Sequence, residues 1–354
     1  MAKVFVMMSG GVDSSVACGV LVQAGYEVVG VFMKCWSLES LRQMNLPDSL
    51  YGCFWEDDLQ DASLVAKKLG VPFEVWDFEK EYKEKVVEYM IQEYQNGRTP
   101  NPDVMCNGQI KFGIFYKTAT NKGADFVATG HYARVKNNQI WRALDKNKDQ
   151  TYFLWQIQAN QIPKILFPIG EFRTKTEVRQ KAKEFGLVTS TKPDSQGLCF
   201  VGHTPLRELL LSSLGRKEGD ILNIENGELL GKHPGAFLYT IGQRKKLGLS
   251  GGPWFVSKID IEANQVWVTH SKNQTPLYSR ELVAKELNWQ IPPSSNHFRC
   301  TAQIRYRQIA IACEVFLSEE QARIIFDKPV RAITSGQSIV FYDNQVLLGG
   351  GVIV

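Results

Sequence analysis

The sequence predicts an α/β protein: a doubly wound, mostly parallel sheet, then a small mixed β-rich middle domain and a C-terminal β-barrel. Two observations carry this prediction. Over the first two hundred residues short apolar runs alternate with helical patterns, and after about residue 204 short strands separated by turns take over. The 354 residues suffice for two or three domains. We therefore expect domains at 1–203, 204–280 and 281–354.

Strands and helices are expected to alternate along the first domain. The expected strands are 4–8, 26–33, 71–78 and 125–132. The expected helices are 14–25, 57–70, 79–97, 107–119 and 174–186. Gly25, Gly70 and Gly186 are typical helix ends, and Thr174 with Glu177 forms a capping-box pattern. This alternation indicates parallel strands joined by helices.

The remaining chain favours antiparallel pairing. Residues 221–231 predict a hairpin that turns at Asn226–Gly227, and 256–270 predict another. From residue 298 onward, short strands are expected within 298–308, 311–317, 322–327 and 338–354. Such a series is typical of a small closed barrel.

Composition is that of an ordinary globular protein, with 44% hydrophobic and 22% charged residues. No apolar run is long enough to span a bilayer, and the start lacks the pattern of a signal peptide, so we expect a cytoplasmic protein without membrane contact. Seven cysteines without any CxxC spacing argue against a zinc ribbon. The net charge of +4, partly in GQRKKLG (242–248), permits a nucleic-acid partner without requiring one.

The stretch MMSGGVDS (7–14) lies between an expected strand and an expected helix. Gly10 and Gly11 let backbone N–H groups approach an anion, Ser9 and Ser14 add hydroxyl donors, and the helix N-terminus adds positive potential. Phosphate is the ligand that suits this set, although a plain helix cap is the simpler alternative. The loop matches neither GxxxxGK[ST] nor GxGxxG. Asp13 would repel phosphate unless Mg²⁺ bridged them, so we expect Mg²⁺ at Asp13.

Two cysteines follow turn-forming sequences. Cys106 ends GRTPNPDVMC, and Cys199 lies in KPDSQGLCFVG (192–202). Two prolines flank Asn101, so we expect Cys106 on a loop just before a helix, whose N-terminus can lower a thiol pKa. Asp103 is near enough in sequence to exchange a proton with it.

The other cysteines are expected to differ in role. Cys18, Cys300 and Cys313 fit a small buried side chain. Cys35 and Cys53 stay unassigned.

SGGVDSS is similar to the signature of the PP-loop ATP pyrophosphatase superfamily, whose members cleave ATP between the α- and β-phosphates. Further motifs extend along the whole chain, and together they resemble the tRNA-specific 2-thiouridylase family of bacteria and mitochondria. These motifs are SGGVDSSV, GYEVVGVFMK, GRTPNPDVMCN, GADFVATGHYAR, DKNKDQTYFL, DSQGLCFVG, TIGQRKKLG, IRYRQ and TSGQSIVFYDN.

The resemblance implies a specific reaction. ATP with Mg²⁺ would adenylate O2 of the uridine at the wobble position, as in the Lys, Glu and Gln tRNAs. A persulfide sulfur would then replace the adenylated oxygen, giving 2-thiouridine, AMP and pyrophosphate. A cysteine desulfurase or a sulfur-relay protein would supply the sulfur, and a monomer would suit a substrate as large as tRNA.

The resemblance also implies roles for individual residues. Cys199 matches the persulfide carrier, Cys106 the second catalytic cysteine, with a transient disulfide between them, and Asp103 a general acid/base. The nucleotide-binding positions are Met7, Met8, Ser9, Gly10, Gly11, Val12, Asp13, Ser14, Met33 and Gly130. The tRNA-binding positions are Asn101, Pro102, Asp103, His131, Lys148, Asp149, Gln150, Arg305, Tyr306 and Gln337.

Several of these residues have a simpler interpretation. His131 also fits a core histidine, and residues 148–150 fit a solvated turn. Arg305 and Arg307 are two apart on an expected strand and would share one face, which suits either phosphates or water.

Two other functions stay open from the residues alone. An ATP-dependent ligase or amidotransferase would use the same loop without needing Cys106 and Cys199. A non-catalytic RNA-binding protein would use the barrel and the basic loops and consume no ATP.

Overall fold

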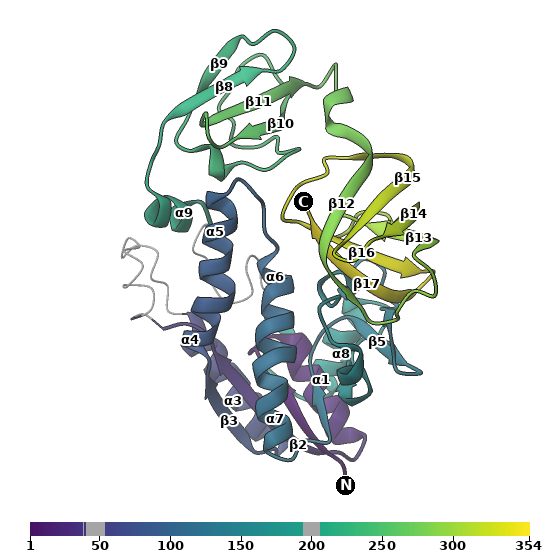
Figure 1. Ribbon diagram of the computed structural model, residues 1–354. Coiled ribbons are helices and arrows are strands. Elements are labelled where there is room, and N and C mark those ends of the chain that lie inside the picture. Colours follow the sequence, from purple (N-terminus) through teal and green to yellow (C-terminus); the bar gives the residue numbers. More distant parts are fainter. Residues whose placement is uncertain (38, 40–53, 194–205) are drawn as a thin grey trace.

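Three β-sheets organise the computed structural model, which describes residues 1–37, 39, 54–193 and 206–354 (Figure 1). A five-stranded sheet forms the N-terminal domain, a four-stranded sheet lies at the far end of the molecule, and a barrel lies beside both. The predicted α/β fold with a β-rich middle part and a C-terminal barrel is confirmed.

The N-terminal sheet has the order β3-β2-β1-β4-β7, and each of its pairings is parallel. Its strands are β1 (Lys3–Met7), β2 (Glu27–Lys34), β3 (Phe73–Asp77), β4 (Phe126–Ala128) and β7 (Ile165–Leu166). Buried apolar residues fill β1 and β2 because both faces of these strands are covered by helices.

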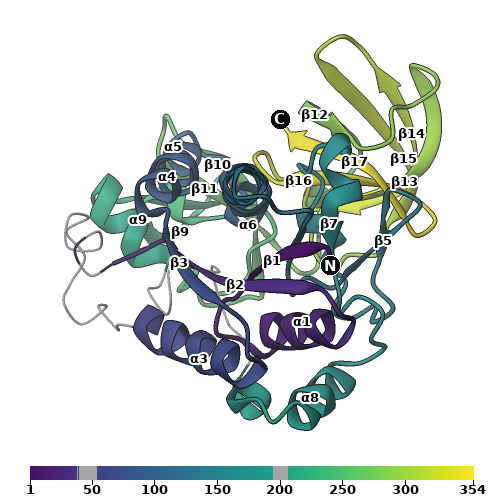
Figure 2. The same cartoon turned by 90° about the horizontal axis from the view of Figure 1, so that it is seen from below.

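Helices cover both faces of this sheet (Figure 2). One face carries α1 (Val12–Gln23), α3 (Phe54–Leu69) and α8 (Lys175–Glu184). The other carries two rods made of α4 (Glu79–Tyr82), η2 (Lys83–Glu88), α5 (Tyr89–Gln95), and of α6 (Pro102–Met105), η3 (Cys106–Phe115), α7 (Tyr116–Asn121). Within each rod a π-helical segment links two α-helices. Each face of the sheet therefore has its own apolar core.

The middle sheet has the order β10-β11-β8-β9 and is mixed, because β11 pairs with β8 in parallel. It follows α9 (Leu206–Leu214), and its strands are β8 (Gly219–Asn223), β9 (Leu229–His233), β10 (Trp254–Asp260) and β11 (Gln265–His270). Both predicted hairpins form, and Gly227 adopts the positive φ of 74° that its turn needs.

The C-terminal barrel has six strands and is closed by pairing between β12 and β17. The strands are β12 (Tyr278–Trp289), β13 (His297–Gln303), β14 (Ile311–Leu317), β15 (Gln321–Arg331), β16 (Ser338–Asp343) and β17 (Val346–Ile353). Cys300 and Cys313 lie opposite each other on β13 and β14, with their Sγ atoms 3.8 Å apart, so their predicted place in the barrel is confirmed.

A hairpin of the N-terminal domain extends the barrel sheet. Strands β5 (Ala133–Lys136) and β6 (Gln139–Arg142) join it through β17. The turn at Asn137 and Asn138 has positive φ at both residues, a conformation that asparagine tolerates. The sequence analysis did not predict this hairpin, although the Asn-Asn pair is a sequence signal for such a turn.

Short 3₁₀ turns complete the chain. They are η4 (Thr151–Phe153), η5 (Ala159–Lys164), η6 (Val188–Thr191), η7 (Ala236–Leu238) and η8 (Thr275–Leu277). No helix in the described part of the chain is both long enough and apolar enough to cross a membrane.

Two local expectations were wrong. The rod that carries Cys106 begins at Pro102, because proline is well tolerated at the first helical position, so Cys106 lies inside the rod instead of on a loop. Arg305 and Arg307 lie in a turn after β13, where Arg307 has a φ of 65°, so they do not share one face of a strand.

Candidate active site

The predicted nucleotide-binding residues gather at the carboxyl edge of the parallel sheet. The loop 8–11 follows β1, Met33 lies near the end of β2, and Gly130 follows β4. Ligands of open α/β sheets bind beyond this edge, so these positions can face one ligand.

The loop after β1 is tightly packed around its glycines. Gly10 has a φ of 72°, and a Cβ there would lie 2.2 Å from the backbone oxygen of Asp58 on α3. The backbone N–H of Ser9 donates to Ser14 Oγ at 3.1 Å, and the two hydroxyl oxygens are 3.2 Å apart. The loop thus places small polar groups at the N-terminus of α1, where an anion is stabilised.

Gly130 brings the end of β4 against this loop. A Cβ at Gly130 would lie 2.6 Å from the backbone nitrogen of Ser14. The backbone of residue 130 therefore borders the expected phosphate position, and any side chain there would push the loop away.

Asp13 has partners that the sequence did not reveal. Lys175 Nζ donates to both carboxylate oxygens of Asp13, at 2.8 Å each, and the Tyr132 hydroxyl donates to one of them at 2.9 Å. Lys175 is the first residue of α8 and lies 162 positions along the chain from Asp13. The one sequence signal for this contact was a basic residue at the start of a helix, where acidic residues are usually favoured.

Asp13 does not fit a magnesium ligand in this arrangement, because both of its oxygens face the Lys175 ammonium. Among the described residues no group of three or more His, Cys, Asp or Glu side chains could hold a metal. The predicted Mg²⁺ contact at Asp13 therefore gains no support from the geometry, which instead adds Lys175 as a cation beside the loop.

Cys106 is buried at this same edge. Asn101 is the N-cap of its helical rod, and its side-chain oxygen accepts from Val104 N at 3.4 Å. Cys106 is 1% exposed and shares an apolar cluster with Cys35, which follows β2. Burial raises the pKa of the Cys35 thiol well above its usual value, and the Cys106 sulfur raises it further.

The other two cysteines that bear on the site, Cys199 and Cys53, lie outside the described residues. Cys18 is buried in α1 as predicted, and burial raises the pKa of its thiol to about 12.

His131 and residues 149–150 make internal bonds. His131 Nδ1 lies 2.8 Å from Thr129 Oγ1, and burial lowers the pKa of the imidazole well below its usual value. Asp149 accepts from Arg142 at 2.7 Å, and Gln150 accepts from the backbone N–H of Tyr132 at 2.9 Å. Lys148 lies beside them and is half-buried. Contact of these residues with tRNA stays a prediction.

Arg305 and Gln337 hold the domains together around the start of the Cys106 rod. Arg305 Nη2 donates to the backbone oxygen of Ile241 at 2.8 Å and to Thr334 Oγ1 at 2.6 Å. Gln337 Nε2 donates to the backbone oxygens of Thr99 and Pro100 at 2.9 and 3.1 Å. These side chains fix the segment that leads to Asn101.

Tyr306 packs on Phe153, with ring centroids 4.5 Å apart. Its contact with tRNA, like those of Arg305 and Gln337, stays a prediction.

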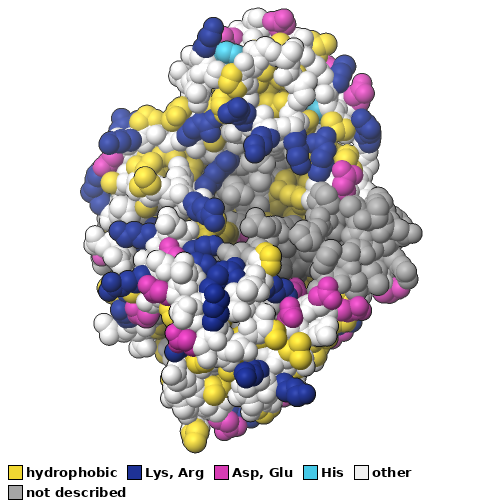
Figure 3. Space-filling view, turned by 180° about the vertical axis from the view of Figure 1, so that it is seen from behind, with side chains coloured by type: hydrophobic (Ala, Val, Ile, Leu, Met, Phe, Trp, Pro, Cys, Tyr) yellow, Lys and Arg dark blue, Asp and Glu magenta, His cyan; other side chains and the backbone are white. Residues whose placement is uncertain are grey.

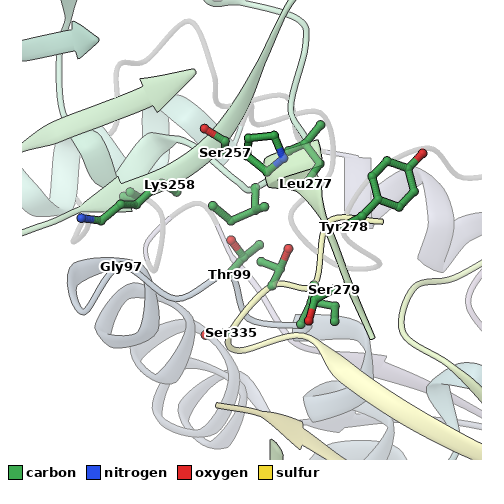
Figure 4. Close-up of a pocket in the computed structure, with 13 residues that line it drawn as sticks. Gly97, Thr99, Ser257, Lys258, Leu277, Tyr278, Ser279 and Ser335 are labelled. Carbon is green, nitrogen blue, oxygen red and sulfur yellow. The ribbon is translucent and has the colours of Figure 1, made fainter. Parts of the chain in front are cut away.

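A cavity of about 310 Å³ opens between the connection that follows α5, the middle sheet and the barrel (Figure 4). It lies between the connection after α5, strand β10 and the start of β12. Labelled residues on its wall include Thr99, Lys258, Tyr278 and Ser335. On the face opposite to that of Figure 1, Lys and Arg side chains gather around a hollow (Figure 3). Such a surface suits a polyanion.

Three domain models match the chain and together cover most of it. Their descriptions are tRNA methyl transferase HUP domain for residues 2–203, tRNA methyl transferase PRC-barrel domain for 207–270, and aminomethyltransferase beta-barrel domain for 279–353.

Curated relatives are similar over almost the full length. A protein of Alkaliphilus oremlandii named tRNA-specific 2-thiouridylase MnmA is 45% identical over 361 residues, covering 99% of this chain and 96% of that protein. Proteins with the same name from Listeria monocytogenes serotype 4a and Enterococcus faecalis are 45% and 44% identical, each over 99% of this chain and over 94% and 95% of those proteins. Among solved structures, a 4-thiouridine synthetase–RNA complex with bound ATP reaches a TM-score of only 0.33 at 18% identity, covering 60% of this chain and 50% of that one.

Proposed function

The chain belongs to the tRNA-specific 2-thiouridylase family, and on this premise we propose that it replaces O2 of a tRNA wobble uridine with sulfur in an ATP-dependent reaction. One observation carries the proposal: a glycine-rich loop suited to phosphate and the buried Cys106 lie at the same edge of one parallel sheet. The substrate would be a tRNA of the Lys, Glu or Gln type.

The first step is adenylation of the uracil O2. In the proposal ATP lies on the loop 7–14, with Met33 and Gly130 beside it. The backbone N–H groups and the serine hydroxyls hold phosphate oxygens, and Lys175 offsets negative charge as pyrophosphate leaves. Phosphate oxygens would supply most ligands of any Mg²⁺ that accompanies ATP, and no step here depends on the ion.

The second step transfers sulfur. Cys199 carries a persulfide loaded by a cysteine desulfurase or a relay protein. The Cys106 thiolate attacks the inner sulfur of that persulfide, forming a Cys106–Cys199 disulfide and releasing hydrosulfide. Hydrosulfide adds to C2 of the adenylated uracil and AMP departs with the former O2. A dithiol reductant then supplies two electrons to reopen the disulfide. Alternatively the outer sulfur of the persulfide attacks C2 directly and AMP departs, leaving the base joined to Cys199 through an S–S bond. The Cys106 thiolate then attacks the Cys199 sulfur, which forms the same disulfide and releases the 2-thiouridine.

Asp103 serves as the proton acceptor and donor in these steps, since it precedes Cys106 by three residues on the same rod. The uridine must leave the anticodon stack to reach a site this buried. Asn101 and Pro102, at the start of the rod, lie where they can meet the flipped base.

In the proposed division of labour, residues 1–203 carry the chemistry, and 204–280 and 281–354 hold the tRNA. The cationic face supports this division. Because tRNA and ATP meet in the cytoplasm, we expect the enzyme to act there, as a monomer that binds one tRNA.

The test uses purified protein, ATP, Mg²⁺, sulfide and an unmodified Lys or Glu tRNA transcript. Nucleosides are identified by mass spectrometry for the wild type and for Cys106→Ala and Cys199→Ala. We expect 2-thiouridine with the wild type. Because free sulfide can replace the hydrosulfide that Cys106 releases from Cys199, both variants should keep part of the activity with sulfide and lose it when a cysteine desulfurase with cysteine is the only sulfur source. AMP without a thiolated base would favour a ligase. A methylated uridine would favour the chemistry named in the domain descriptions, and both results contradict the proposal.

A further inference from the structure

A buried lysine lies beside the candidate cysteine site and has no part in the steps above. Lys111 is 9% exposed, and its Nζ donates to Asn107 Oδ1 at 2.9 Å. Asn107 is fixed in turn, because its Nδ2 donates to the backbone oxygen of Phe153 at 3.1 Å. The ammonium is therefore held in place by a side chain that is itself anchored.

The helical geometry brings Lys111 onto the side of Cys106. Both residues belong to η3, whose π-helical bonds join residues five apart, and Lys111 follows Cys106 by five positions. Because little water screens the charges at buried positions, an ammonium there interacts strongly with an anion that forms nearby.

Two further groups locate the ammonium at the carboxyl edge of the sheet. Lys111 lowers the pKa of the Cys35 thiol, against the larger effect of burial, and it adds to burial in lowering the pKa of His131. Cys35 follows β2 and His131 follows β4. The positive charge thus lies between the ends of these strands, in the space that Cys35 shares with Cys106.

We propose that the Lys111 ammonium stabilises the anionic sulfur of Cys106 during sulfur transfer, as a positioning residue. The inference rests on the proposed function. When Cys106 loses its proton to a base such as Asp103, a thiolate forms in an apolar cluster where water cannot solvate it. A fixed ammonium on the same rod supplies the missing stabilisation until the sulfur enters the disulfide with Cys199.

Other titratable groups surround this space and contribute to its charge. They are Cys35 and Lys34 from the β2 end, Asp77 and Glu79 from the β3 end, Tyr82 from α4, Asp103 from α6 and His131 after β4. Asp77 at the end of β3 and Glu79 at the start of α4 pair with Lys34, and the lowered pKa of His131 keeps its imidazole neutral near pH 7.

The experiment compares Lys111→Met, Lys111→Arg and Lys117→Met, the last being an exposed lysine on the same rod. Thiolation rates are measured across pH with persulfide-loaded protein, ATP and tRNA, and pyrophosphate release is followed in the same samples. For Lys111→Met we expect the acid limb of the rate to move up by about one pH unit, a roughly tenfold loss at neutral pH that recovers as pH rises. Lys111→Arg and Lys117→Met should keep the wild-type profile, and pyrophosphate release, which reports the adenylation step, should persist in all three.

Three outcomes would overturn the inference. They are an unchanged profile in Lys111→Met, a loss that is equal at every pH, and failure of the conservative Lys111→Arg to preserve the acid limb in folded protein. If Lys111→Met does not fold, as judged by circular dichroism, Lys111→Gln takes its place with the same expected shift. Absence of thiolation in the wild type would instead refute the proposed function, so the two failures are distinguishable.

Discussion

The ion pair between Lys175 and Asp13 offers a sharp test of the nucleotide site. Two bonds of 2.8 Å join the ammonium to the carboxylate, and the lysine side chain is 16% exposed. Hydrogen bonds that involve charged groups contribute about 1.5–3 kcal/mol each when they are shielded from water. In Lys175→Met the loop keeps the negative charge of Asp13 and loses the ammonium that balances it. The Asp13 carboxylate would then repel a bound phosphate.

One lost ammonium–phosphate bond of that strength should raise the Kd for ATP about 10- to 100-fold. Equilibrium binding of ATP measures this change, with Lys183→Met as the control, because Lys183 is an exposed lysine on the same helix. Unchanged ATP affinity in folded Lys175→Met would refute the assignment of Lys175 to the phosphate site.

Three further predictions follow from packing and burial. Gly25 has a φ of 82° and open space around it, so Gly25→Ala should lower the unfolding free energy by about 1–2 kcal/mol. Gly10→Ala should lower it by about 1–3 kcal/mol more, because the added Cβ meets the Asp58 backbone. Urea unfolding measures both changes, and equal costs would contradict the predicted clash. Gln337→Ala should lose about 1–2 kcal/mol and slow thiolation more than ATP binding, since it frees the backbone before the Cys106 rod; an unchanged thiolation rate would contradict that role. The pKa of the Cys18 thiol is raised from about 9 to about 12, so its stabilising contribution is complete below pH 9 and is lost as pH rises toward 12. Between about pH 9 and 11 the unfolding free energy of the wild type should therefore fall by about 1.4 kcal/mol per pH unit more than that of Cys18→Ala, and parallel curves would contradict the burial argument.

The phosphate loop could be predicted from sequence because its parts are contiguous. Gly10, Ser14 and the start of α1 lie within a few residues, so local geometry alone brings them together. The same holds for the hairpin at Asn226–Gly227, where the turn conformation depends on two adjacent residues.

Other features depend on the tertiary fold and could not be read from the chain. Lys175 reaches Asp13 only because α8 packs beside α1, and Cys35 meets Cys106 only because the second rod covers the end of β2. The sequence motifs predict that Arg305 and Gln337 contact RNA. In the structure both side chains donate hydrogen bonds to backbone oxygens of other parts of the chain, Arg305 to Ile241 and Gln337 to Thr99. A polar side chain in a motif does not reveal whether it faces solvent or a neighbouring domain.

The central claim is that the uracil oxygen leaves on AMP and sulfur takes its place. The most direct measurement uses a tRNA whose wobble uridine carries heavy oxygen at O2, followed by mass spectrometry of the released AMP. The account predicts heavy oxygen in the AMP phosphate, in an amount equal to the 2-thiouridine formed. AMP that carries only ordinary oxygen, while 2-thiouridine accumulates, would contradict it.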